Sequence, residues 1–201
     1  MKKKIDAAKR IKGILGTTCL LFIFLTGCGN KDAITTNTVS IGKGGIITQT
    51  IVEDFPMDTY DIEELKQMNE EEVNEYNTQT GAENISIKKT ETDGSKVTVV
   101  MEYESANAYY EFNHKDLYVG TVEQAKTAGY DMNTPLKDIK TGKALTKEEV
   151  DVIGEKHIVI VTEPIDVKTF GTVLYISDGV TYKNKKLVTV SGEHTAYIVF
   201  K

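Results

Sequence analysis

A short apolar segment behind a cluster of positive charges divides the chain into a leader and a body. The strongly apolar part runs from Ile14 to Leu25, and lysine and arginine are frequent before it. A helix that crosses a bilayer needs about 20 apolar residues, so this segment is too short for a permanent span. A basic start, a short apolar core and small residues at its end are typical of a secretory signal peptide. We therefore expect residues 1–27 to be removed and the fold to be built from the remainder.

The leader ends in the motif Leu25-Thr26-Gly27-Cys28. This motif resembles the lipobox of bacterial lipoproteins, in which the cysteine is lipidated and the leader is cut just before it. The resemblance implies a mature chain that begins at Cys28, carries two acyl chains and is anchored to the cell membrane facing outside the cytoplasm. Two chains hold a protein stably, whereas one holds it marginally. The alternatives are a chance cysteine in a plain secretory signal and an uncleaved anchor.

The composition of the body limits its chemistry. Removing residues 1–27 leaves 174 of the 201 residues, enough for one ordinary domain. The leader takes six basic residues and one acid with it, so the formal net charge falls from −6 to −11. No local basic patch stands out, so we expect no binding to nucleic acid. Cys19 leaves with the leader and Cys28 carries lipid, which excludes disulfides, a cysteine nucleophile and cysteine-ligated zinc in the domain.

The first half of the body predicts a linker, a helix and a hairpin. Residues 28–45 are small and polar, and we expect a flexible tether there. Asp61 with Glu64 resembles a capping box at the start of an amphipathic helix over residues 62–78, and Gly81 follows its end. Asp93-Gly94 predicts the turn of a hairpin that includes residues 96–103. Shorter helices are expected after Ser105 and after Thr121.

The second half of the body predicts short strands separated by turns. Residues 157–162, 166–169, 172–177, 180–182, 187–190 and 194–200 are rich in β-branched and aromatic residues. We expect one α+β domain over residues 46–201. Its long N-terminal helix would pack on a mainly antiparallel sheet, and its β-rich C-terminal part would form a small sheet or barrel.

The body also resembles uncharacterised lipoproteins of anaerobic Gram-positive bacteria. The stretches that carry this resemblance are residues 60–65, 103–105, 120–125 and 197–201. That family implies no known activity.

Residues with catalytic or metal-binding chemistry are sparse. Ser191 and His194 are close in sequence, but they flank a predicted turn in which neighbouring side chains diverge. His114 and Asp116 are the nearest pair to a metal site, on a loop. Paired carboxylates for glycoside hydrolysis stay open, because many acids are available and none is singled out. We expect no cofactor and no metal, and no residue is assigned a catalytic role.

An aromatic cluster is the best candidate for a binding face. Tyr109, Tyr110 and Phe112 lie among amide and carboxylate side chains that could help to seat a glycan or an envelope protein. Tyr109 and Phe112 are spaced i, i+3, which favours packing of both on the hairpin over a binding face. We expect a non-catalytic, membrane-anchored binding or envelope-assembly module of unknown ligand. The alternative is a small hydrolase acting on wall or glycan material. A solute-binding subunit of an importer fits less well, because the chain is short for two lobes.

Overall fold

The computed structural model describes residues 35–192 and 194–201. The lipobox-like residues Leu25, Thr26, Gly27 and Cys28 lie outside the described residues. Within the described part of the chain, no helix is both long and apolar enough to cross a membrane.

Strands dominate the described chain. They are β1 (Thr38–Ile41), β2 (Ile47–Asp54), β3 (Ile85–Asp93), β4 (Lys96–Tyr103), β5 (Leu117–Thr121), β6 (Lys137–Asp138), β7 (His157–Val161), β8 (Asp166–Thr169), β9 (Val173–Ile176), β10 (Val180–Asn184), β11 (Leu187–Val190) and β12 (Ala196–Phe200). The helices are the 3₁₀ helix η1 (Lys43–Gly45), α2 (Ile62–Thr80), α3 (Ala106–Asn113), α4 (Val122–Thr127) and α5 (Lys147–Val152).

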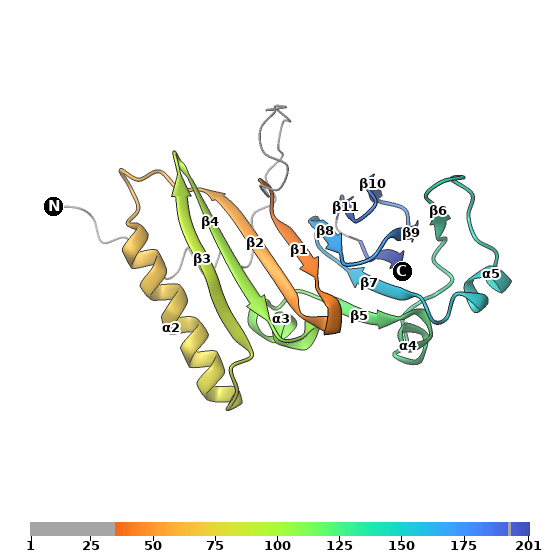
Figure 1. Cartoon of the computed structure of the whole chain (residues 1–201), viewed down its shortest axis with the longest axis horizontal. Helices are drawn as coiled ribbons and strands as arrows, with labels where there is room; N and C mark the ends of the chain where they lie inside the picture. The colour runs from red at the N-terminus through yellow and green to blue at the C-terminus, as the bar shows by residue number, and fades with distance from the viewer. Residues whose placement is uncertain (1–34, 193) are drawn as a thin grey trace.

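The strands form two sheets. The seven-stranded sheet has the order β10-β11-β8-β1-β2-β4-β3, and the five-stranded sheet has the order β5-β7-β12-β9-β6. β1 pairs with β8 in parallel, and the other pairings within the two sheets are antiparallel. Figure 1 shows α2 alongside β3 at one end of the long axis, with α4, α5 and β6 towards the other end.

The hydrophobic core has two layers, one on each face of the five-stranded sheet. Val159 and Ile198 point towards the seven-stranded sheet and share a cluster with Val39 and Val167. Their neighbours on the same strands, including Ile158 and Val199, point the other way into a second cluster with residues from α4 and α5. Because β7 and β12 are buried on both faces, their sequences are apolar throughout instead of alternating.

The expected α+β fold, with one helix layer on one mainly antiparallel sheet, is wrong. The protein is mostly β, with two stacked sheets and mainly short helices. The helix expected at 62–78 is present as α2, but it covers only the β3–β4 end of one sheet through Leu65 and Val73. The C-terminal strands do not form the separate small sheet or barrel that the sequence had predicted. β8 and β11 complete the seven-stranded sheet, and β7, β9 and β12 form the middle of the other.

The tether expected over residues 28–45 is also corrected in its second half. Residues 38–41 form β1, which lies between β2 and β8 in the middle of a sheet. Val39 and Ile41 alternate with Thr38 and Ser40, and both apolar side chains are buried in the main core. The small polar residues of this stretch are typical of a linker. For this reason the alternation of apolar and polar residues over residues 38–41 was not recognised as a strand.

A hydrogen bond links α2 to α3. The Tyr76 hydroxyl donates to Glu111 over 2.7 Å, and the Tyr76 ring meets Phe112 edge-on at 5.7 Å. Partial burial, followed by this hydrogen bond, raises the pKa of Tyr76 to about 12. Hydrogen bonds from Tyr76 and then from Asn107 lower the pKa of Glu111.

We expect Tyr76→Phe to move the pKa of Glu111 back towards its ordinary value of 4.5, because the larger of its two side-chain hydrogen bonds is lost. Since the folded-state pKa of Glu111 is depressed, this link stabilises the fold above the unfolded-state pKa. Its contribution disappears as the pH falls through the folded-state pKa. NMR titration of the side-chain carboxyl carbons measures the shift. Tyr110→Phe on α3 is the control and should leave Glu111 unchanged; an equal response in both variants would refute the assignment.

Candidate functional site

The three aromatic residues expected to form a binding face do not share one exposed surface. Tyr109 is 0% exposed, Tyr110 is 47% exposed, and Phe112 is half-buried against the main core. Successive residues of a helix point about 100° apart, so α3 directs Tyr109 inwards and Tyr110 outwards. Tyr110 alone remains available to a partner.

Tyr109 belongs to a buried structural network instead. Its hydroxyl donates to Glu163 over 2.8 Å, and its ring packs against Tyr103 at 5.2 Å. The Tyr103 hydroxyl in turn donates to Gln49 over 2.7 Å. Burial raises the pKa of both tyrosines well above the ordinary value. These side chains hold α3 between the two sheets. Both tyrosine hydroxyls donate hydrogen bonds within the network, to Glu163 and to Gln49.

The histidines lie apart and each has a structural position. His114 ends α3 with a left-handed backbone at φ 54°. His157 stacks on Phe200 at 5.4 Å, and His194 Nε2 lies 3.1 Å from the carbonyl oxygen of Asp178. Within the described residues, no group of three or more His, Cys, Asp or Glu side chains is placed to hold a metal ion.

An open cavity of about 450 Å³ lies beside α4 and α5. We call it the α4–α5 pocket. Its lining comes from two stretches, residues 126–136 and residues 144–151. A backbone hydrogen bond of 2.8 Å from Leu145 to Leu136 ties the two stretches together. Volumes of about 300–1,000 Å³ are typical of small-molecule sites.

Local sequence signals build the frame of the pocket. Thr121 and Thr146 cap α4 and α5, each in a reciprocal capping box with Gln124 and Glu149 respectively. Between the helices, Asp138 accepts hydrogen bonds from two backbone N–H groups of the following turn, both at 2.8 Å. These bonds lower the pKa of Asp138. They also stabilise the turn through which the chain passes from β6 to residues 144–151, the second stretch of the pocket lining.

The pocket has an apolar part and a charged rim. Leu136 and Val150 are buried in the second core cluster, and Met132 and Leu145 pack against it. On the rim, Lys126 of α4 meets Asp151 of α5 at 2.5 Å. The hydrogen bond and charge of Lys126 lower the pKa of Asp151, and the hydrogen bond to Asp151 raises the pKa of Lys126. Lys147 and Asp131 add a further charge of each sign to the lining.

Sequence reasoning missed this pocket. The apolar residues Met132, Leu136 and Leu145 stand singly between turn residues, without helical or strand periodicity. Their shared signal is that large apolar side chains recur in a stretch otherwise typical of surface loops. Only the pairing of β6 with β9 places them over the five-stranded sheet.

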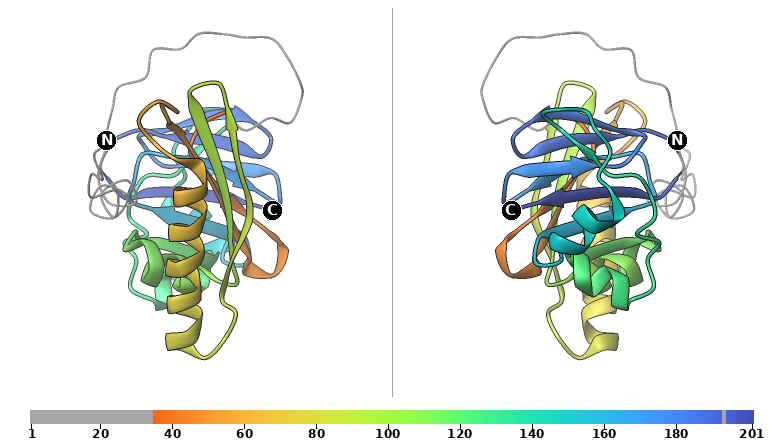
Figure 2. Two further views of the ribbon diagram at one scale, coloured as in Figure 1. Left: turned by 90° about the vertical axis from the view of Figure 1, so that its left-hand side faces the viewer. Right: turned by 90° about the vertical axis from the view of Figure 1, so that its right-hand side faces the viewer.

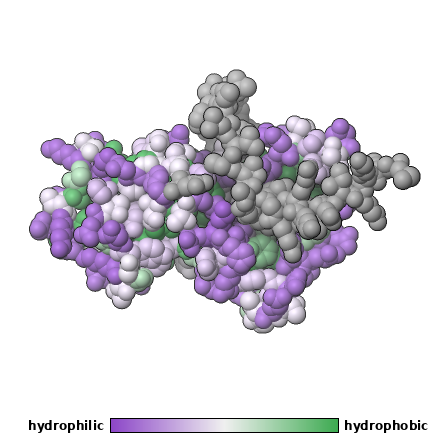
Figure 3. Space-filling view, turned by 180° about the vertical axis from the view of Figure 1, so that it is seen from behind, coloured by the Kyte–Doolittle hydropathy of each residue, from purple (hydrophilic) through white to green (hydrophobic). Residues whose placement is uncertain are grey.

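One face of the molecule can be inspected for apolar area in a space-filling view. Figure 3 shows a face that is mostly hydrophilic, with hydrophobic residues in small separate patches. We compared the chain with models of known protein families, with curated proteins and with solved structures, and none of them matches.

Proposed function

We propose that the chain is a lipid-anchored, extracytoplasmic binding protein that holds a small amphipathic ligand in the α4–α5 pocket. The observation that carries this proposal is the cavity itself, which combines an apolar floor with charged groups at its rim. The location is supported by the basic and apolar leader and by the lipobox-like motif that ends at Cys28.

The lining defines the ligand class. An apolar body would contact Leu136, Leu145 and Met132, and a polar group would reach Lys147 or the Lys126–Asp151 pair. A few polar groups around an apolar floor fix the orientation of a ligand without supplying a reaction. We therefore expect selectivity for molecules with one apolar and one charged end.

The chemistry of the rim favours binding over hydrolysis. A glycosidase needs a carboxyl group whose pKa is raised so that it can donate a proton. The pKa of Asp151 is lowered instead, because Lys126 stabilises its ionised form. The ion pair links α4 to α5 across the rim of the pocket.

We expect the fluorescent probe 1-anilinonaphthalene-8-sulfonate, which is apolar with one anionic group, to bind the α4–α5 pocket. Leu145→Asp should weaken probe binding about tenfold, because a negative side chain replaces apolar contact area inside the cavity and repels the anionic group of the probe. The measurement is a fluorescence titration of the chain from residue 28 onwards, with Cys28→Ser to keep it unlipidated.

The matched control is Val152→Asp. Val152 lies on α5 but is 82% exposed and outside the pocket lining. Its substitution should leave the affinity unchanged. Equal affinities of the Leu145→Asp variant and the parent protein, with both shown to be folded by circular dichroism, would rule out the pocket as the binding site.

A further inference from the structure

Five lysines from separate parts of the chain meet at one end of the stacked sheets. We call this set the basic pole; its members are Lys43, Lys168, Lys185, Lys186 and Lys201. All five are exposed. Lys43 follows β1 and Lys168 is in β8, while the pair 185–186 forms the β10–β11 turn and Lys201 follows β12.

Strand pairing brings these segments together. The last residues of β1 and β8, Ile41 and Thr169, are directly paired. Thr169 N–H donates to the carbonyl oxygen of Lys186, and Val173 N–H donates to that of Lys185, each over 2.8 Å. Thr172 N–H donates to the carbonyl oxygen of Lys201 over 2.7 Å. Figure 2 shows the C-terminus and the orange turn after β1 on the same side of the molecule in both views.

Four of the five lysines of the basic pole lie in a stretch of the chain with few acids. Between residues 167 and 201 the acids are Asp178 and Glu193, and Asp178 pairs with Lys137. Across residues 35–192 and 194–201, the ion pairs use other lysines, namely Lys66, Lys88, Lys89, Lys96, Lys115, Lys126 and Lys137.

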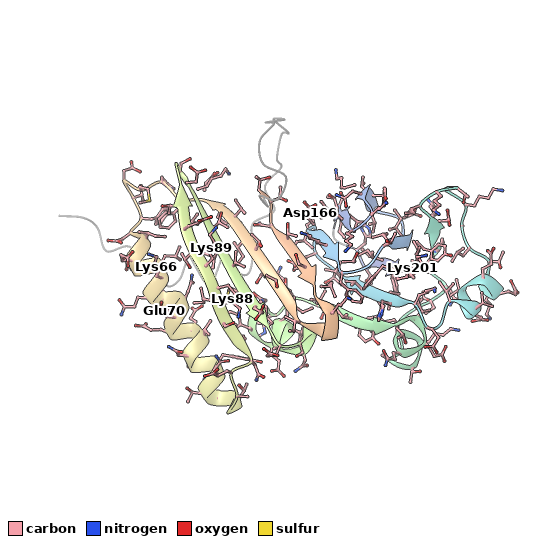
Figure 4. All side chains as sticks on the ribbon, viewed as in Figure 1. Lys66, Glu70, Lys88, Lys89, Asp166 and Lys201 are labelled. Carbon is pink, nitrogen blue, oxygen red and sulfur yellow. The ribbon has the colours of Figure 1, made fainter. Side chains whose placement is uncertain are left out.

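The acidic charge is concentrated elsewhere, much of it on α2. This helix carries Glu63, Glu64, Glu70, Glu71, Glu72 and Glu75. Figure 4 shows Lys66 and Glu70 of α2 at one end of the molecule and Lys201 in the other half. The domain therefore has a negative end and a positive pole, and such a separation of charge orients a protein near a charged surface.

We propose that the basic pole docks the domain on anionic phospholipid headgroups of the membrane to which the lipid anchor ties it. The choice of a membrane rests on the anchor put forward under Proposed function. The chain from Cys28 to Thr35 spans at most roughly 25 Å when extended. It leads into β1 at Thr38, whereas the basic pole lies beyond Ile41 at the other end of this strand, about 10 Å further on. An extended linker of this length is long enough for the pole to turn towards the headgroups.

The basic pole is built of lysine, as are all Lys/Arg positions of the body, because the single arginine of the chain is Arg10. Lysine is a compact point charge with a flexible stem, so it can approach several headgroups without a fixed geometry. Clusters of lysine beside an anionic bilayer strengthen binding about fivefold per residue.

The test uses the chain from residue 28 onwards with Cys28→Ser, so that no acyl chain contributes. Vesicles of phosphatidylcholine alone are compared with vesicles that also contain phosphatidylglycerol, by co-sedimentation. We expect binding only to the anionic vesicles, weakened by added salt. The double variant K185E/K186E should lose at least about tenfold in affinity, since two of five lysines change sign.

The control is K66E/K89E, which makes the same change in net charge at the acidic end. It should bind as the parent protein does. Equal losses in the two double variants, or no binding of the parent protein to anionic vesicles at low salt, would overturn the proposal. Binding to soluble poly(glycerol phosphate) but not to anionic vesicles would assign the basic pole to a polymer and exclude membrane docking. Because the protein is unlipidated, none of these outcomes depends on the anchor.

Discussion

Val39→Asp is expected to lower the free energy of unfolding by about 4 kcal/mol or more, because it buries a carboxylate without a partner and removes apolar contact. Val39 is 0% exposed and lies in the main core. It is paired with Gln49 of β2 on one side and with Val167 of β8 on the other. Domains of this size are stable by only about 5–15 kcal/mol, so the substitution removes much of the total.

Ser40→Asp is the matched control for this prediction. Ser40 is the next residue of β1, and its half-buried side chain points to the opposite face of the sheet. A change there should lower the free energy of unfolding by only about 1 kcal/mol, because a half-buried carboxylate keeps contact with water. Urea unfolding followed by circular dichroism measures both variants. A similar, small effect of the two substitutions would mean that β1 is not part of the folded core.

The position of β1 also changes how the domain has to be produced. A chain shortened to residues 46–201 lacks the strand that joins β8 to β2. Such a chain would expose the edges of both neighbours and the apolar side chains that β1 covers. Binding experiments on this protein therefore need the residues from 35 onwards.

Local features of the fold could be predicted from the sequence because neighbouring residues determine them. The hairpin expected at Asp93-Gly94 is present: Asp93 ends β3 opposite Lys96, and Gly94 and Ser95 form the turn, with Gly94 at φ 59°. Gly81 ends α2 in the left-handed conformation, and Thr121 caps α4 as expected. In these cases the backbone geometry and the hydrogen bonds involve residues within four positions of each other.

The sheet arrangement could not be predicted because it depends on distant pairings. Thr38 lies opposite Asp166, far along the chain, and the two strands run parallel. No hairpin turn marks that contact in the sequence. When this contact is not known, residues 28–45 look like a tether and the C-terminal strands look like a separate unit. These two interpretations led to the wrong fold class.

The candidate surfaces were hard to predict for similar reasons. The i, i+3 spacing of Tyr109 and Phe112 predicted that both pack on the core, and in the structure Tyr109 is 0% exposed and Phe112 is half-buried. Spacing alone did not predict how much of Tyr110 stays exposed. Net charge hid the basic pole, since its lysines are spread from Lys43 to Lys201 and are outnumbered by acids in other regions. Only the pairing of the strands brings these lysines to the same end of the sheets.

Cys28→Ser is expected to abolish the stable attachment of the protein to the membrane. In a bacterial host that processes lipoproteins, the unaltered chain should stay in the membrane fraction after a high-salt wash, which removes electrostatic contacts. The variant has no thiol to accept lipid at this position. Each buried CH₂ of an acyl chain contributes about 0.8 kcal/mol, so losing both chains removes far more binding energy than exposed lysines can replace.

Cys19→Ser is the control, because this cysteine belongs to the proposed leader and should be dispensable for anchoring. Mass spectrometry of the intact protein distinguishes the outcomes. A lipidated chain that begins at Cys28 supports the anchor, and incorporation of a labelled fatty acid should disappear in Cys28→Ser but persist in Cys19→Ser. An unmodified thiol at Cys28, or a mature chain that retains residues 1–27, would exclude the lipoprotein assignment. Either result would also leave the basic pole without a membrane to dock on, even if it bound anionic vesicles in vitro.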